Sequence, residues 1–335
     1  MPYPQLAPAQ AIALPVPSQD VRNQMLALDR TEANHVDAIA KLACMNRVEA
    51  PPAPHLARLQ FPFTTVAWNV ERCHVLEPSA ALLAEQKADL VLLSEMDNGM
   101  SRTGQRHTTR EVAAHLDMAY AYGVEFLELE LGTGVMLPYC KDPQNDKGFH
   151  GNAILARTAL QMPTMLRLPD QLFWFNPQAK AARVGTRCAI MAVIATEQGP
   201  LCAVSVHLEN LGDTAHRARQ VEAILDAIEE TYGEMPVILG GDLNTGLANG
   251  GDFEKEELFE LARQRSYVRH SGEIDQMTTR PSRFSQNPQG LRFKLDWFLT
   301  RGVRVGQSSI IPSLGPDNEV LSDHDMIRIE IEGLE

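Results

Sequence analysis

Short apolar runs recur between residues 64 and 332 of this 335-residue chain, and several of them contain almost no polar residue. Examples are "ADLVLLSE", "RCAIMAVIAT" and "PVILGGD". A strand with one face in water alternates apolar and polar residues, whereas a continuously apolar strand is buried on both faces. The sequence therefore predicts sheets that other layers cover on both sides.

The remaining pattern between these runs indicates an α/β sandwich. We expect strands at residues 64–70, 88–95, 151–157, 187–196, 201–208, 236–242, 294–300, 308–312 and 325–332. We expect helices at 79–88, 109–119 and 214–233, the last with Thr214 as its N-terminal cap. The regular strand-helix alternation of a barrel is missing, which favours a layered sandwich.

The first 60 residues have a different composition. A proline- and alanine-rich start precedes residues 20–45, where apolar residues recur at helical spacing, and a proline cluster follows at residues 50–54. We expect a helical arm and linker over residues 1–60 and the main domain over residues 61–335. The arm either packs on the main domain or contacts a partner subunit, and the oligomeric state stays open.

Charge and cysteine content narrow the functional classes. The net charge of -13 disfavours a general electrostatic grip on long nucleic acid. The five cysteines form no CxxC pair, which argues against a disulfide framework and a zinc-thiolate site. Neither a membrane-spanning run nor a secretory leader is evident. We therefore expect a cytoplasmic protein without a membrane span.

Polar residues cluster where the predicted strands end, at six places along the chain. They are Asn69 with Glu71, Glu95, His207, Asp242 with Asn244, Asp296, and Asp323 with His324. Carboxylates that converge in a cleft repel one another and are costly to desolvate unless a cation compensates them. Oxygen ligands without paired cysteines favour Mg²⁺ or Mn²⁺. Asp296 could orient the His324 imidazole and raise its basicity.

The motifs "WNVE", "SE", "GNAIL", "HLEN", "GDLN", "LDWFL" and "SDH", in this order, resemble those of the endonuclease/exonuclease/phosphatase superfamily, the DNase I-like metal-dependent phosphoesterases. The resemblance covers roughly residues 64–331. It implies a four-layered α/β sandwich, in which two mixed β-sheets pack face to face between helices.

The resemblance also implies roles for individual residues. The implied catalytic residues are Asn69, His207, Asp242, Asn244, Asp296 and His324, and the implied metal ligands are Glu71, Glu95 and Asp323. Asn152 of "GNAIL" matches a recurrent asparagine, which we assign to substrate binding. Arg187, on a predicted strand, either clamps an anionic group of the substrate bidentately or lies on a solvated strand edge. The basic loop at residues 99–111 is a second candidate for substrate contact.

The implied reaction is hydrolysis of a phosphate ester by in-line attack of water, with one or two Mg²⁺ or Mn²⁺ ions. We expect a small or mid-sized phosphodiester or phosphomonoester as substrate. The alternatives are a Mg²⁺-dependent nuclease that acts on DNA or RNA, and a scaffold adapted to non-phosphate chemistry or to binding only.

Overall fold

The computed structural model describes residues 5–52, 57–285 and 290–335 and contains two mixed β-sheets in that part of the chain. The seven-stranded sheet has the order β1 (Gln5–Ala7), β8 (Gln161–Arg167), β10 (Cys188–Thr196), β11 (Gly199–His207), β12 (Val237–Asp242), β14 (Asp296–Arg301) and β13 (Val268–His270). The nine-stranded sheet has the order β15 (Val303–Ile311), β16 (Met326–Leu334), β4 (Phe63–Arg72), β5 (Leu90–Asn98), β7 (Phe149–Ala156), β6 (Ala119–Glu128), β3 (Val48–Glu49) and β2 (Gln10–Ala11), with β9 (Arg183–Gly185) paired to β6.

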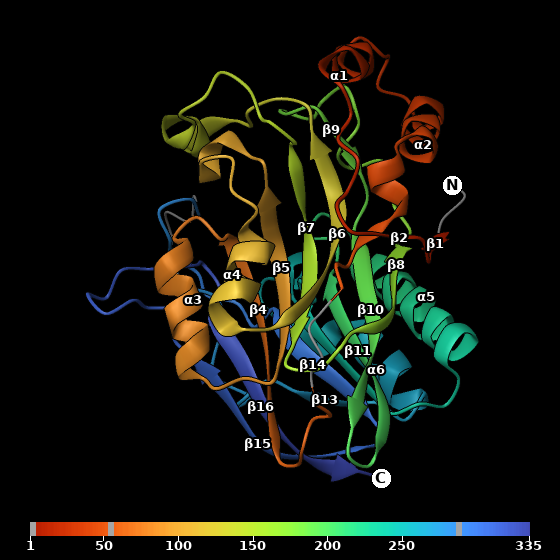
Figure 1. Cartoon of the computed structure of the whole chain (residues 1–335), viewed down its shortest axis with the longest axis vertical. Coiled ribbons are helices and arrows are strands. Elements are labelled where there is room, and N and C mark those ends of the chain that lie inside the picture. The colour runs from red at the N-terminus through yellow and green to blue at the C-terminus, as the bar shows by residue number, and fades with distance from the viewer. Residues whose placement is uncertain (1–4, 53–56, 286–289) are drawn as a thin grey trace.

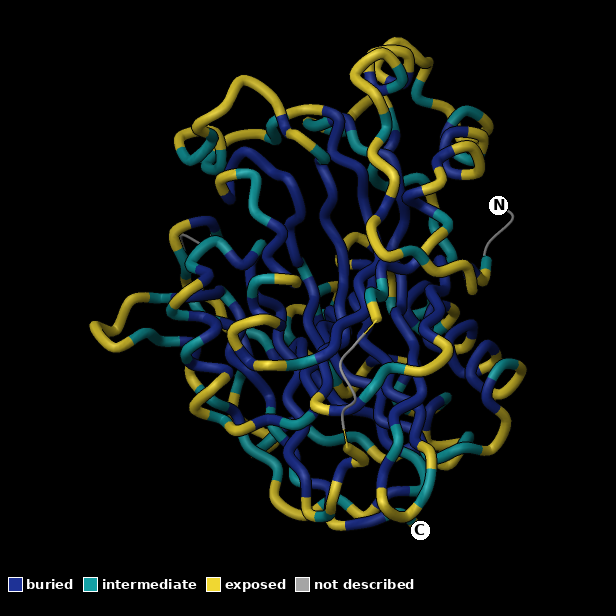
Figure 2. The backbone as a smooth tube through the Cα atoms, in the orientation of Figure 1, coloured by how far each residue is buried: buried dark blue, intermediate teal, exposed yellow. Residues whose placement is uncertain are grey.

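The two sheets pack face to face and helices cover their outer faces (Figure 1). Helices α3 (Leu76–Glu85) and α4 (Thr108–Leu116) lie on the nine-stranded sheet, and α5 (Thr214–Tyr232) and α6 (Glu257–Gln264) lie on the seven-stranded sheet. Buried residues are concentrated in the strands at the centre of the molecule, and the outer helix surfaces and loops are exposed (Figure 2). The predicted four-layered α/β sandwich is confirmed.

Three apolar clusters account for these layers. The inner cluster fills the space between the sheets and includes Ala67, Leu92, Ile154, Ile190, Ala203, Ile238 and Phe298. One outer cluster joins α3 and α4 to β4 and β5, and the other joins α5 and α6 to β11 and β12. The central strands are thus covered on both faces, which is why their sequences are continuously apolar.

The strand directions bring several polar strand ends to one edge of the sandwich. Strand β4 runs parallel to β5, and β11 runs parallel to β12, so their carboxyl ends lie together. Strand β14 is antiparallel to β12, with Asp296 opposite Asp242. The first residue of β14 is therefore beside the last residue of β12.

The sequence missed two central strands and one cap. Strand β6 is buried throughout although its sequence "AYAYGVEFLE" contains a glycine and two glutamates, and β8 contains Pro163. The cap of α5 is Asp213, whose carboxylate accepts a hydrogen bond from the His216 N–H at 2.7 Å. The prediction of Thr214 as the cap was wrong by one residue, since either side chain can cap a helix.

The N-terminal arm contributes to both sheets. It contains α1 (Gln19–Leu26) and α2 (Glu32–Lys41), while β1 extends the seven-stranded sheet and β2 and β3 extend the other. Its Arg22 guanidinium donates to the carbonyl oxygens of Asn145, Asp146 and Lys147. Residues 1–4 and 53–56, which include part of the proline cluster, lie outside the described residues. A domain boundary at residue 60 and contact with a partner subunit stay predictions.

Five short 3₁₀ helices occur among the described residues: η1 (Ala43–Asn46), η2 (Ser101–Thr103), η3 (Gly134–Tyr139), η4 (Leu247–Asn249) and η5 (Phe253–Lys255). In the same part of the chain, no helix has both the length and the apolar character needed to cross a membrane.

Candidate active site

Asp242 lies at the centre of the polar cluster, at the end of β12. Gly241, which precedes it, has a φ of +149°, and a Cβ there would lie 2.0 Å from the Val206 carbonyl oxygen of β11. Only glycine therefore lets β12 approach β11 so closely before the turn. In the turn, the Asn244 N–H donates a hydrogen bond to Asp242 Oδ1 at 2.9 Å. The backbone thus fixes the orientation of this buried carboxylate.

The other oxygen of Asp242 faces three side chains from three different segments. Asn69 Nδ2 donates to Asp242 Oδ2 at 3.0 Å. His207 Nε2 lies 3.4 Å from the same oxygen, and His324 Nε2 lies 3.6 Å from it. Asn69, His207 and His324 therefore contact Asp242, and Asn244 belongs to its turn. Together with Asp242 itself, these are five of the six predicted catalytic residues.

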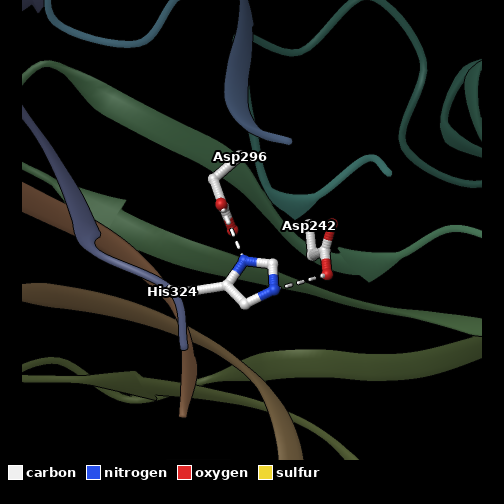
Figure 3. A group of neighbouring side chains, drawn as sticks. All are labelled: Asp242, Asp296 and His324. Atoms are coloured by element: carbon white, nitrogen blue, oxygen red, sulfur yellow. Dashed lines mark hydrogen bonds and ion pairs between the residues drawn. The ribbon is translucent and has the colours of Figure 1, made fainter. Parts of the chain in front are cut away.

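The sixth predicted catalytic residue, Asp296, holds His324 (Figure 3). His324 Nδ1 lies 2.8 Å from Asp296 Oδ2, and both side chains are buried. Burial alone would lower the pKa of His324, but Asp296, Asp242 and Asp323 together raise that pKa well above its ordinary value. Burial raises the pKa of Asp296 to about 6, against the opposing effect of His324. The raised pKa favours an imidazolium, and its Nε2 faces Asp242.

Glu71, Glu95 and Asp323, the predicted metal ligands, carry mutually repelling charges. Burial, followed by repulsion from Asp323, raises the pKa of Glu71 to about 8. Burial and repulsion from Glu95 likewise raise the pKa of Asp323, although His324 lowers it. Glu95 differs, because Arg72 Nη1 lies 2.7 Å from its Oε2 and helps to lower its pKa well below the ordinary value despite burial.

The backbone at two of these carboxylates is unusual. Glu71 has a φ of +45° and Glu95 a φ of +59°, both in the left-handed region that a glutamate rarely occupies. The pairing register shifts at the same places, between Asn69 and Arg72 and between Leu93 and Met96. Such irregularities re-aim side chains near functional sites. They turn these two carboxylates away from the ordinary alternation of β4 and β5.

Two groups of side chains offer oxygen or nitrogen atoms to a metal ion. Asp242, Asp296 and His324 form one compact group, with ligand atoms within 4.8 Å of one another. However, His324 Nδ1 already lies 2.8 Å from Asp296 Oδ2, so the ligand atoms of this group are used on one another. The carboxylates Glu71, Glu95 and Asp323 fit a hard divalent cation better, because its charge would remove their repulsion. The assignment of ligands to these three residues stays a prediction.

Arg187, predicted to clamp an anionic group, is bound by the protein's own acceptors. Its Nη1 lies 2.6 Å from Glu125 Oε1, its Nε lies 3.4 Å from Glu209 Oε2, and its Nη2 donates to Asn210 Oδ1 at 3.1 Å. The same Nη1 lies 2.9 and 3.0 Å from the two ring nitrogens of His207. Arg187 therefore packs against His207, and its guanidinium N–H groups already have partners within the protein.

Asn152 is held by a backbone carbonyl oxygen and not by another predicted site residue. Its side chain is buried between the sheets, where Nδ2 donates to the Cys188 carbonyl oxygen at 2.9 Å. Within the described residues it forms no hydrogen bond to another predicted site residue. The Asn244 side chain similarly donates to the Leu208 carbonyl oxygen at 2.9 Å, so its contact with Asp242 runs through the backbone.

Three residues near the site were missed by sequence reasoning. Arg72 pairs with Glu95, and Glu125 lies 3.5 Å from His207 Nδ1 through its Oε2. Ser282 donates from Oγ to Glu71 Oε1. Arg72 directly follows the "WNVE" motif, so its position was the available signal, whereas nothing in the sequence linked Glu125 or Ser282 to the cluster.

Comparisons with known proteins identify the family and support the fold. The model of the Endonuclease/Exonuclease/phosphatase family matches residues 66–324. An endonuclease/exonuclease/phosphatase from Beutenbergia cavernae is similar in structure, with a TM-score of 0.59 and 14% identity over 81% of this chain and 71% of that one. The catalytic domain of human nocturnin with bound sulfate has a TM-score of 0.54 and 17% identity over 83% of this chain and 96% of its own.

A functionally unknown protein from Enterococcus faecalis is also similar, with a TM-score of 0.54 and 17% identity over 81% of this chain and 99% of that one. No curated protein matches the chain in sequence. At these identities the structural likeness concerns the fold alone.

Proposed function

We propose that this chain, which belongs to the endonuclease/exonuclease/phosphatase family, is a metal-dependent phosphoesterase that hydrolyses a small or mid-sized phosphate ester. The observation that carries the proposal is the environment of Asp242 Oδ2, which Asn69, His207 and His324 all face. A single carboxylate oxygen surrounded by one amide donor and two imidazoles suits a group that orients and deprotonates a water molecule.

Asp242 acts as the base in this proposal. Its Oδ1 is held by the Asn244 N–H and its Oδ2 by Asn69, so the carboxylate is fixed before the substrate arrives. Preorganisation of this kind lowers the cost of reaching the transition state. The water it orients would attack phosphorus in line with the leaving oxygen.

His324 and His207 stabilise the charge that develops on the phosphorus oxygens. Asp296 accepts from His324 Nδ1, which leaves Nε2 as the donor to the reacting group. The raised pKa of His324 keeps this imidazole protonated at neutral pH. Charged donors in a buried site contribute more to transition-state stabilisation than the same donors in water.

Glu71, Glu95 and Asp323 are the residues we expect to hold Mg²⁺ or Mn²⁺. When bound, such an ion polarises the phosphate and neutralises developing charge. Glu71 must lose its proton to become a ligand, and its pKa is raised to about 8. Metal affinity should therefore increase with pH.

The surroundings of the site favour a compact substrate. A cavity of about 500 Å³ adjoins Arg72, which pairs with Glu95, and this volume is typical of small-molecule sites. The net charge of -13 disfavours long nucleic acid. Three of the four basic residues at 99–111 are paired, Arg102 with Asp97, Arg106 with Glu111 and His107 with Glu49, and the fourth, Arg110, is exposed on α4. The loop therefore gives little support to the nuclease alternative.

A panel of phosphate esters tests the proposal. Purified protein would be incubated with phosphomonoesters, phosphodiesters and short oligonucleotides, in EDTA and with added Mg²⁺ or Mn²⁺. We expect metal-dependent release of phosphate or alcohol from small esters. No turnover of any phosphoester in the panel would contradict the proposal and favour non-phosphate chemistry or binding only.

All five cysteines are free, and a cytoplasmic location stays a prediction.

A further inference from the structure

The cavity beside the acidic cluster has an unusual charge distribution. It is formed mainly by the segment after β6 and the segment before β9, and Arg72 connects it to Glu95. Its basic lining residues are Arg72, Arg102, Lys180 and Arg183, and its acidic lining residue is Glu128. The function of the cavity depends on which of these cations the protein itself neutralises.

Two of the arginines are neutralised. Arg72 pairs with Glu95 at 2.7 Å. Arg102 is buried and donates to both oxygens of Asp97 and both oxygens of Glu128, at 2.8 to 3.0 Å. These guanidinium groups form part of the cavity wall, and their charges are already paired with carboxylates of the protein.

The Arg183 side chain has no ion-pair partner in the described part of the chain. Its guanidinium forms no hydrogen bond and no ion pair with any residue that the structure describes, although the carboxylates of Glu128, Glu125 and Glu209 favour its charged form. Its guanidinium carbon lies 3.6 Å from the centre of the Trp174 ring and 4.1 Å from the centre of the Phe126 ring. The acidic side chain in the cavity lining, Glu128, already binds Arg102 through both of its oxygens.

The stacking explains how Arg183 is kept in place without a counterion. The faces of Trp174 and Phe126 attract a guanidinium and restrict its rotation. Its N–H edges stay available to a planar or tetrahedral anion, and desolvation by burial lowers its pKa only to about 10, so the group is charged at neutral pH. Lys180, exposed on the same wall, adds a second positive charge. The guanidinium of Arg187, four residues later, is by contrast bound by Glu125 and Asn210.

We propose that Arg183 binds a second anionic group of the substrate, a phosphate or a carboxylate, while the scissile phosphate lies at Asp242. This inference rests on the proposed function and narrows its substrate class to phosphate esters that carry a further anionic group. Arg183 and Lys180 would select such a substrate, because an ester without the second anion leaves the guanidinium unpaired.

Binding in the absence of metal tests the site independently of activity. Pyrophosphate and malonate would each be titrated calorimetrically into the full chain in EDTA at low salt, where the carboxylates around Asp242 repel anions. We expect wild type to bind at least one probe and Arg183→Gln to bind it about tenfold more weakly or worse. A preference for pyrophosphate assigns a phosphate group, and a preference for malonate assigns a carboxylate.

Arg269→Gln is the matched control. Arg269 also lies over an aromatic ring, 4.7 Å from the centre of Phe259, but it pairs with Glu254 and lies outside the cavity lining. Its variant should bind the probes like wild type. Arg183→Met repeats the test if Arg183→Gln fails to fold. Absence of binding by wild type, or equal affinities for wild type and a folded Arg183 variant, would overturn the proposal.

Hydrolysis separates this inference from the proposed function. The substrates are thymidine 5′-(p-nitrophenyl phosphate) and the same compound with a 3′-phosphate. Arg183→Gln should raise KM about tenfold for the 3′-phosphorylated compound and leave KM unchanged for the other. Equal changes for both would overturn the inference. If neither compound nor the ester panel is hydrolysed, the proposed function fails, and the titration in EDTA still decides whether Arg183 binds anions.

Discussion

His324 and Asp296 form a buried imidazole-carboxylate pair in which Nδ1 lies 2.8 Å from Oδ2. Asp296 is the first residue of β14 and lies opposite Asp242 of β12 in the same sheet. The carboxylate that orients the histidine and the carboxylate that faces its other nitrogen therefore belong to neighbouring strands. This arrangement fixes the direction in which His324 can donate a proton or a hydrogen bond.

The pair should behave as one unit in catalysis. We expect Asp296→Asn to lower kcat by about 10² to 10³, because it removes the charge that orients His324 and stabilises its protonated form. His324→Ala should lower kcat at least as much. The double variant should be no worse than His324→Ala alone, because both substitutions remove the same interaction. Multiplied effects in the double variant would show that the two residues act independently.

Arg187 and Arg183 should differ in their contribution to stability. Arg187→Met leaves the buried Glu125 carboxylate without its closest cation, so we expect a loss of about 3 to 5 kcal/mol in the free energy of unfolding. Arg183→Met, the matched control from the same segment, breaks no ion pair and should cost less than about 1 kcal/mol. Denaturant unfolding of both variants measures the difference, and similar losses would contradict the assignment.

Glu71 should make the metal-free protein less stable as pH rises. Its folded-state pKa is about 8, above its ordinary value of 4.5, so its contribution is fully present below pH 4.5 and is lost as pH rises through 8. In EDTA we expect the Tm of wild type to fall relative to that of Glu71→Gln between pH 5 and 8.5.

Added Mg²⁺ should reverse this loss, because the ion competes with the proton for the same carboxylate. The rise in Tm on adding Mg²⁺ should be larger at pH 8.5 than at pH 5, and smaller in Glu71→Gln. Parallel Tm profiles for the two proteins across this pH range would exclude Glu71 as the titrating group.

Salt dependence should separate a small-substrate enzyme from a nuclease. We expect KM for a small phosphate ester to change little between 50 and 200 mM salt, because few counterions are released on binding. A protein that tracks a long nucleic acid loses affinity steeply over this range. Strong, salt-sensitive cleavage of a 20-nucleotide strand would favour the nuclease alternative.

The sequence predicted the centre of the site because strand ends determine it. Asn69, His207, Asp242 and Asp296 each follow or begin a continuously apolar run, and such runs become the buried strands of a layered sheet. Once two neighbouring strands are parallel, their carboxyl ends lie at one edge. The family motifs then indicated which of these polar side chains to expect in one site.

The sequence could not predict how the arginines are partnered. Arg187 is satisfied by Glu125 and Arg102 by Glu128, and both glutamates belong to β6. That strand combines a glycine with two buried glutamates, so its sequence lacks the apolar pattern of a central strand. The left-handed backbone of Glu71 and Glu95 was equally hidden, because it depends on the pairing register and not on residue type.

The role of Asp242 is best measured by the hydrolysis of bis(p-nitrophenyl) phosphate by wild type and Asp242→Asn, in EDTA and with Mg²⁺ or Mn²⁺. Asp226→Asn is the control, since Asp226 is exposed on α5 and pairs with Arg265. We expect metal-dependent release of p-nitrophenol by wild type and Asp226→Asn, and a rate for Asp242→Asn that is lower by a factor of at least about 10³. Undiminished, metal-dependent hydrolysis by Asp242→Asn would contradict the central role of this carboxylate.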